Sequence, residues 1–306
     1  ERQRLRADVI QLLRGAVPVI SDAVSVSPAE ASLTEEEFSE RVNACKEYIA
    51  SGDIYQIVLS VLFRGKTNVP PFAVYRALRL LNPSPYMFFF DFDDLQVVGS
   101  SPEALVKLNG VTASLRPIAG TLPRGATSEE DDANEAALLA DPKEAAEHGM
   151  LVDLARNDLG RGASAGSVYV DPYRAIERYS HVMHIVSGVQ GELAPEFDQF
   201  DLFAASFPAG TLVGAPKVRA MEIIDELEPV KRGVYSGAVG DLSWEGNMDT
   251  AIAIRTAVIK DKQLSIQAGA GIVYDSVPEN EWAETMNKAR AIFRAVTLAE
   301  SGLDKK

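Results

Sequence analysis

The chain has 306 residues, 46% of them hydrophobic and 24% charged, which is the composition of a globular protein with a sizeable core. Acidic residues outnumber basic ones by 44 to 30, so the net charge is −14 and a nucleic-acid partner is not expected. No apolar run approaches the roughly 18 residues of a membrane span. The charged start "ERQRLRADVI" has no secretory signal, so we expect a cytoplasmic protein with no membrane partner.

Helical patterns fill most of residues 1–50 and are interrupted by a linker at 17–32. Thr34 stands three residues before Glu37, as in a capping box, and predicts a helix start. Periodicity then predicts strands near 54–63, 86–92, 95–100, 104–108 and 111–115 with a helix at 71–81, helices at 128–139 and 142–155, strands near 167–170 and 182–191, helices near 199–205 and 215–227, four strands between 235 and 272, and a last helix at 279–299. Runs of strands between pairs of helices indicate an α+β fold with large, mostly antiparallel sheets.

The single cysteine, Cys45, lies in a helical pattern and excludes both a disulfide framework and a cysteine metal cluster within the chain. We expect it to be a packing residue.

One polar residue breaks the apolar pattern of the first predicted strand. In "SGDIYQIVLS", Gln56 shares a strand face with Ile54 and Val58, so a covered face would bury an amide.

Two pairs of glutamates lie far apart in the sequence. Glu144 and Glu147 are three residues apart, as are Glu281 and Glu284, so each pair shares one face of a predicted helix, and Lys288 follows one turn later. The acids could be solvated first-turn residues that the helix dipole favours. If the helices converge, four carboxylates without histidine or cysteine form a hard-cation site, for which Mg²⁺ is expected.

Nine segments together resemble the chorismate-utilising enzymes, most closely the large subunit of anthranilate synthases. In order from about residue 38 to 298, they are "GDIYQIVLS", "NPSPYMFFFDF", "GSSPEALVKL", "RPIAGTLPRG", "EHGMLVDLARNDLGR", "HVMHIVSGVQGEL", "FPAGTLVGAPKVRAMEIIDELEP", "RGVYSGAVG" and "AGAGIVYDSVPENEWAETMNKA". The resemblance implies two antiparallel sheets packed as a sandwich with helices outside. It also implies a chorismate-binding catalytic domain over 38–300, preceded by a helical arm and linker over 1–37.

The resemblance implies a Mg²⁺ site between the sheets. Glu147 and Glu284 would bind the ion directly, and Glu144 and Glu281 through water. The ion would hold the ring carboxylate of chorismate.

Further substrate contacts follow from the same resemblance. The backbone of Gly269, Ala270 and Gly271, together with Lys288, would complete the cradle of the ring carboxylate. Arg255, which alternates with apolar residues in "IAIRTAVI" and is therefore expected in a strand, would hold the enolpyruvyl carboxylate with Tyr235. Thr211 is also assigned to substrate binding.

The implied reaction is displacement followed by elimination. A nucleophile enters at C2 of chorismate as hydroxide leaves C4, and loss of pyruvate then gives an aromatic product. Glu103 is expected to be the acid that protonates the leaving hydroxyl, and burial would keep it protonated. His184 is expected to act in the second step, with His181 as the alternative.

Two positions bear on the nucleophile. Relatives that add water carry a lysine base where this chain has Gln56, and relatives that aminate C4 carry a lysine nucleophile where it has Ala119, beside Thr121. Ammonia needs no strong base, so both residues favour amination at C2 and anthranilate as the product. Leu122 departs from the arginine of many relatives.

Other activities stay open at this point. The enzyme could stop at 2-amino-2-deoxyisochorismate, belong to the 4-amino-4-deoxychorismate branch, or be a homologue without catalysis. The chain has no cysteine in a glycine-rich nucleophile loop, so ammonia should come from a separate glutamine amidotransferase subunit. In full-length relatives, an additional N-terminal segment and elements including "NPSPYM", at 82–87 here, together form a site for feedback inhibition by tryptophan. We expect that segment to be absent from this chain, and we therefore expect the chain to be insensitive to tryptophan.

Overall fold

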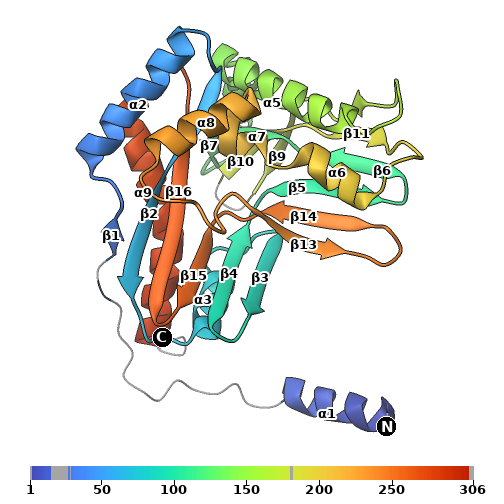
Figure 1. Ribbon diagram of the computed structural model, residues 1–306, viewed down its shortest axis with the longest axis vertical. Coiled ribbons are helices and arrows are strands. Elements are labelled where there is room, and N and C mark those ends of the chain that lie inside the picture. The colour runs from blue at the N-terminus through green and yellow to red at the C-terminus, as the bar shows by residue number, and fades with distance from the viewer. Residues whose placement is uncertain (1, 15–26, 28, 180–181, 303–306) are drawn as a thin grey trace.

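The computed structural model describes residues 2–14, 27, 29–179 and 182–302, which form antiparallel sheets with helices packed on them (Figure 1). The helices are α1 (Arg2–Arg14), α2 (Glu35–Ala50), α3 (Pro71–Leu81), α4 (Ser128–Ala140), α5 (Pro142–Gly160), α6 (Gln199–Ser206), α7 (Gly210–Val213), α8 (Lys217–Leu227) and α9 (Pro278–Ser301). The strands are β1 (Glu30–Ala31), β2 (Gln56–Lys66), β3 (Tyr86–Asp91), β4 (Leu95–Ser101), β5 (Ala104–Asn109), β6 (Thr112–Leu115), β7 (Ile118–Pro123), β8 (Tyr169–Val170), β9 (Ala175–Arg178), β10 (Val182–Val186), β11 (Val189–Glu192), β12 (Gly214–Ala215), β13 (Ala238–Leu242), β14 (Met248–Ile252), β15 (Thr256–Lys260) and β16 (Gln263–Ile272).

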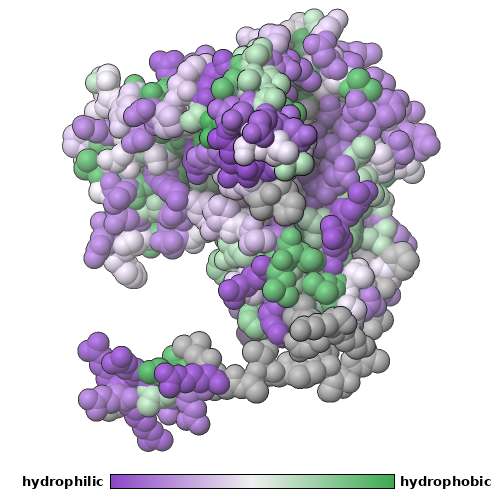
Figure 2. All heavy atoms as spheres, turned by 180° about the vertical axis from the view of Figure 1, so that it is seen from behind, coloured by the Kyte–Doolittle hydropathy of each residue, from purple (hydrophilic) through white to green (hydrophobic). Residues whose placement is uncertain are grey.

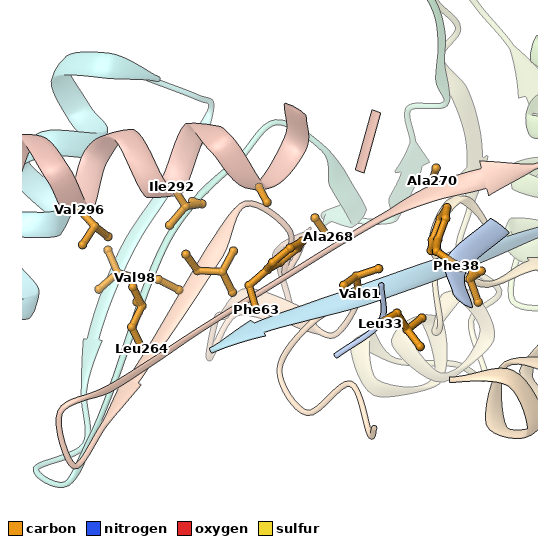
Figure 3. Close-up of a cluster of buried hydrophobic side chains, with 14 of the residues drawn as sticks. Leu33, Phe38, Val61, Phe63, Val98, Leu264, Ala268, Ala270, Ile292 and Val296 are labelled. Carbon is orange, nitrogen blue, oxygen red and sulfur yellow. The ribbon is translucent and has the colours of Figure 1, made fainter. Parts of the chain in front are cut away.

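The seven-stranded sheet carries the larger core. Its order is β1-β2-β16-β15-β4-β3, with β12 paired to β2, and α2, α3 and α9 pack on it. Figure 3 shows Ile292 and Val296 of α9 among the strand residues Phe63, Val98 and Leu264, which belong to the same buried cluster. The amphipathic helices therefore bury their apolar faces against the sheet, which is the main source of their stability.

Two further sheets complete the fold. The six-stranded sheet has the order β13-β14-β5-β6-β11-β8, and the three-stranded sheet the order β7-β10-β9. Helix α5 packs on strands of both sheets, so its side chains lie along the boundary between them.

The two large sheets are joined by two chain segments, each of which leaves one sheet and enters the other. Strand β4 of the first sheet continues into β5 of the second, and β14 of the second continues into β15 of the first. The amide of Ile252 donates to the carbonyl of Glu103 at 3.0 Å, and that of Ser100 donates to the carbonyl of Arg255 at 3.1 Å. Backbone hydrogen bonding thus continues through the passage, which we call the junction (residues 102–103 and 253–255).

Most sequence predictions of the elements are confirmed, including the α+β class and the large antiparallel sheets. The capping box of Thr34 and Glu37 is present. Cys45 is fully buried, and burial raises the pKa of its thiol to about 12, as fits a packing residue. Much of the predicted linker, at 17–26 and 28, lies outside the described residues. The prediction omitted the short elements β1, β7, β9, β12 and α7.

The surface agrees with the acidic composition. Hydrophilic side chains cover most of the face seen in Figure 2, and hydrophobic ones gather in a smaller patch in its lower half. Among the helices that the structure describes, none combines the length and apolar character needed to cross a bilayer.

Gly214 offers a test of how tightly β12 approaches β2. Its φ is +129°, and a Cβ there would lie 2.2 Å from the carbonyl oxygen of Gln56. We expect Gly214→Ala to lower the free energy of unfolding by at least about 2 kcal/mol, because both the backbone and the clash oppose it. Urea unfolding followed by circular dichroism measures the change.

Gly149→Ala is the matched control. Gly149 lies within α5, and a Cβ there meets nothing within 4 Å. This substitution should raise the free energy of unfolding by roughly 0.5–1 kcal/mol, the usual gain of alanine over glycine in a helix. Equal effects of the two variants would contradict the close approach of β12.

Candidate active site

Glu103 lies in the junction between β4 and β5. The hydroxyl of Thr211, on α7, donates to its Oε1 at 2.8 Å. Burial raises the pKa of Glu103 from 4.5 to about 6, against the opposing effects of the Thr211 hydrogen bond and the charges of Lys288 and Arg255. A carboxyl group with this pKa is a usable proton donor near neutral pH.

Arg255 lies in the other half of the junction. The sequence prediction of a strand here is wrong, because the residue occupies the bend between β14 and β15 with a φ of +50°. The apolar alternation that suggested a strand comes from the strands on either side. Arg255 borders a pocket with Asn82, Glu284 and Lys288. Burial lowers the pKa of its guanidinium, while the carboxylate of Glu103 raises it.

His184 on β10 is oriented by a β-bulge. Thr121 and Ala119 of β7 pair with His184 and Ile185, so Gly120 is the extra residue, with a φ of +66°. The Nδ1 atom of His184 lies 3.0 Å from the Gly120 carbonyl and 2.9 Å from the Thr121 hydroxyl.

These contacts fix which nitrogen of His184 can act as a base. A carbonyl only accepts hydrogen bonds, so Nδ1 carries the proton and the lone pair of the neutral ring is on Nε2. Burial lowers the pKa of His184, the Gly120 carbonyl raises it and Arg255 lowers it. The ring is therefore favoured in its neutral, basic form. His181, the alternative, lies outside the described residues.

Ala119 and Leu122 serve packing on β7. Ala119 is buried opposite Ile185 and has no nucleophilic atom to offer. Leu122 packs against the small cluster around Met183 and Ile185.

Gln56 is buried, as its position on the strand face predicts. It begins β2, and Ile54 and Val58 are buried with it. Its Oε1 atom is buried and accepts no hydrogen bond from the described residues, whereas its Nε2 lies 3.3 Å from the position of a Cβ on Gly271. A side chain at position 271 would thus press on the amide, and glycine leaves room for it.

Lys288 connects α9 to the strand that carries Gly269, Ala270 and Gly271. Its Nζ donates to the Gly269 carbonyl at 3.0 Å and pairs with Glu284 at 2.7 Å. In an extended strand the N–H and C=O of one residue point the same way, so the N–H groups of Gly269 and Gly271 face the same side as that carbonyl. Ala270, between them, is fully buried.

Tyr235 is buried beside a polar network that sequence reasoning missed. Burial raises the pKa of Tyr235 above its ordinary value, and the guanidinium carbon of Arg232 lies 5.5 Å from its ring. Arg232 pairs with Glu228 at 2.7 Å, and Glu228 accepts from the amide and hydroxyl of Ser60. The spacing of Glu228 and Arg232, four residues apart, was the available signal, but Pro229 between them concealed it.

The four glutamates of α5 and α9 influence one another. Burial raises the pKa of Glu147, and the charges of Glu144, Glu284 and Glu281 raise it further. Burial also raises the pKa of Glu281. The charges of both glutamate pairs, far apart in the sequence, thus act on Glu147.

The carboxylates of these four glutamates do not form a ready metal site. Among the described residues, no three acidic, histidine or cysteine side chains are close enough to hold a metal as they stand. Glu284 is paired with Lys288 instead. The donor set nevertheless fits a hard divalent cation, since it consists of carboxylates whose mutual repulsion such an ion would relieve.

Comparison with known proteins shows the family of the chain. The profile of the family described as chorismate binding enzyme matches residues 3–294. Anthranilate synthase component 1 of Aquifex aeolicus is 58% identical over 274 residues, which are 90% of this chain and 56% of that protein. The Pseudomonas putida protein of the same name is 60% identical over 269 residues, 88% of this chain and 55% of that protein. The chain therefore spans a little more than half the length of these relatives.

Solved structures show the same similarity. Anthranilate synthase component I from Streptococcus pneumoniae matches with a TM-score of 0.85 and 44% identity, over 95% of this chain and 65% of that one. The isochorismate synthase MenF from Escherichia coli matches with a TM-score of 0.83 and 24% identity, over 96% of this chain and 68% of that one, which shows a likeness of fold alone.

The pKa of Glu103 makes stability depend on pH. Its folded pKa, about 6, lies above the ordinary 4.5, so between these values the folded chain binds more protons than the unfolded one. Stability from this group is therefore complete below pH 4.5 and is lost as pH rises through 6. We expect Glu103→Gln to exceed the wild type in free energy of unfolding by about 1–2 kcal/mol at pH 7.5.

At pH 4.5 that advantage of Glu103→Gln should vanish. Urea titrations at the two pH values test this, with Glu196→Gln, at an exposed carboxylate far along the chain, as the control for a general loss of charge. An advantage of equal size at both pH values would show that Glu103 titrates normally.

Proposed function

Because the chain belongs to the chorismate binding enzyme family, we propose that it is the catalytic portion of an anthranilate synthase. It would convert chorismate and ammonia into anthranilate, pyruvate and water. The observation that carries this proposal is that the fold positions an acid, Glu103, through Thr211 and a base, His184, through Gly120 and Thr121, with the charge of Arg255 acting on both. The names of the relatives support the same activity.

In the first step ammonia attacks C2 of chorismate, the ring double bonds shift, and the C4–O bond breaks. Hydroxide is a poor leaving group, so Glu103 donates its proton and water departs. The ammonium group formed at C2 then loses one proton to solvent, so the net change is addition of ammonia and loss of water. The hydrogen bond from Thr211 keeps the acid in position.

In the second step the proton at C2 is removed and enolpyruvate leaves as pyruvate. Nε2 of His184 takes this proton, because Nδ1 is held by Gly120 and Thr121. The imidazolium formed can return a proton to the departing enolpyruvyl group, so one residue serves both ends of the elimination.

The substrate carries two carboxylates, and the chain offers a separate cationic group for each. Lys288 and the N–H groups of Gly269 and Gly271 would bind the ring carboxylate. Arg255 would bind the enolpyruvyl carboxylate, with Tyr235 beside it. These groups must work locally against a net charge of −14.

We propose Mg²⁺ as the cofactor. Glu147 and Glu284 would hold it directly and Glu144 and Glu281 through water, which requires Glu284 to turn from Lys288. When bound, the ion would neutralise these acids and orient the ring carboxylate.

Gln56 and Ala119 support amination at C2. An amide positions ammonia without acting as a base, and the alanine cannot attack the ring, in contrast to the lysines of relatives with other products. Ammonia would come from a separate glutamine amidotransferase subunit, as the name "component 1" of the relatives suggests. We also propose a cytoplasmic location, which suits a chain with one buried thiol.

Mass identification of the product from chorismate, Mg²⁺ and ammonium tests the function. Anthranilate supports it. Accumulation of 2-amino-2-deoxyisochorismate or 4-amino-4-deoxychorismate would replace it with the related activity, and the absence of any aminated product would overturn it.

The metal assignment predicts loss of activity without loss of fold. Glu147→Gln and Glu284→Gln keep the side-chain shape but remove a charge from the cation site, so kcat should fall by a factor of about a hundred or more. Glu279→Gln, in the first turn of α9, is the matched control and should keep its activity. Activity of either ligand variant that survives treatment with EDTA would refute the assignment.

The role of Gln56 predicts a change of nucleophile. Gln56→Lys places an amine at a buried position, where desolvation lowers its pKa and lets part of it act as a base toward water. We expect a small yield of hydroxylated product, isochorismate, and slower amination, both measured by mass spectrometry. Gln56→Met, similar in size but without a base, should yield none. Unchanged amination in Gln56→Lys would show that the amide does not contact the nucleophile.

A further inference from the structure

A small cavity lies behind Glu103, on the side of α5, α6 and α7. Its lining includes Glu103 and Thr211 together with Asp158 and Ser206. The cavity volume is 40 Å³. Of the described residues that border the pocket of Arg255 and Lys288, none borders this cavity. Glu103 borders this cavity, whereas Arg255 and Lys288, whose charges act on Glu103, border the other pocket.

The cavity continues toward solvent. It shares Ala104, Leu115 and Arg116 with a pocket that also borders Lys107 and Asp249. Arg116 is exposed and paired with Glu177. The exposed Arg116 and the carboxyl group of Glu103 therefore border the same cavity.

The wall of the cavity holds a hydroxyl group that needs a partner. Ser206 is fully buried, and its Oγ makes no hydrogen bond with the described residues. Nearby, Lys217 pairs with the buried Asp158 at 2.8 Å and donates to the Ser206 carbonyl at 3.0 Å. A buried hydroxyl without a partner is costly, and water is its usual remedy.

We propose that this cavity holds a short chain of water molecules that returns a proton to Glu103 after each turnover. This inference rests on the proposed function. A water molecule needs about 10–15 Å³ of such space and two or more polar partners. The cavity offers the volume for more than one, and Ser206, Thr211 and Glu103 offer the partners.

The proton balance explains why a second approach is needed. When the C4–O bond breaks, Glu103 gives up its proton, water forms and a carboxylate remains. The nearest cavity water then transfers a proton to Glu103, and the hydroxide so formed takes one from the next water. A hydronium ion or buffer acid of the solvent beyond Arg116 supplies the last proton. The ammonium group formed at C2 releases one proton to solvent, so the turnover consumes no net proton. Substrate and intermediate can occupy the other side throughout.

Two substitutions interrupt the relay. Ala155→Val on α5 fills the cavity with two methyl groups, and Ser206→Ala removes the hydroxyl that anchors the water. Ala77→Val, on the buried face of α3 and away from the cavity, is the matched control for adding volume to a helix.

Single-turnover and steady-state kinetics with chorismate, Mg²⁺ and ammonium separate a relay from a structural role. At a pH below 6 Glu103 starts mostly protonated, so the first turnover there should stay within twofold of wild type in every variant. Steady-state kcat should fall about tenfold in Ala155→Val and severalfold in Ser206→Ala, with a burst of one product per enzyme. Ala77→Val should show no burst. Unchanged steady-state rates, or equal losses in both phases, would overturn the relay.

The free energy of unfolding of Ser206→Ala tests for water in the cavity without relying on activity. If the cavity is dry, Ser206→Ala removes an unsatisfied hydroxyl and should raise the free energy of unfolding. If it holds water, the variant should be no more stable than wild type, which is the expected result. A wild type that forms no aminated product would refute the proposed function, whereas a stabilised Ser206→Ala would refute the water chain.

Discussion

The site depends on one constraint, that two neighbouring chain segments change sheets at the same level without losing their backbone hydrogen bonds. Interior amides cannot be left unpaired, so the paired strands must leave one sheet and enter the other together. The bonds from Ile252 to Glu103 and from Ser100 to Arg255 satisfy this at the junction. The backbones of Glu103 and Arg255 are thereby fixed in neighbouring segments, and the positive φ of Arg255 is the local conformational cost.

A second irregularity orients the base. The bulge at Gly120 turns one carbonyl out of the β7–β10 ladder, and that carbonyl fixes the tautomer of His184. The same glycine leaves space for the carboxylate of Glu144, which would lie 3.0 Å from a Cβ at this position. His184, the proposed base, and the carboxylate of Glu144 therefore both lie at Gly120, where regular pairing fails.

The parts that could be predicted from the sequence are those with local periodicity. Helix α9 and strand β2 repeat their pattern over many residues, and the three-residue spacing of Glu144 and Glu147 places them on one helix face whatever surrounds the helix. Strand β7 was missed because Gly120 and Pro123 interrupt its pattern, and α7 because it has only four residues. Periodicity over a short window could not distinguish a strand from the bend at Arg255 between two strands.

Contacts between distant segments could not be predicted in this way. The network of Glu228 and Arg232 with Ser60 joins residues 168 positions apart in the chain. The cavity behind Glu103 is enclosed by side chains from α5, α6 and α7, so its existence depends on how well they pack. Such features follow from the assembled fold and leave no mark in any single stretch of sequence.

Under the proposed function, the electrostatics of the site prepare Glu103 for its role. In the free protein Lys288 and Arg255 both lower the pKa of this carboxyl group, against the larger effect of burial. Once each cation is paired with a carboxylate of the substrate, its charge is largely compensated and its effect on Glu103 declines. Exclusion of water by the bound ring acts in the same direction. The pKa of Glu103 therefore rises when substrate binds, and the acid becomes protonated when the C4 oxygen is ready to receive its proton.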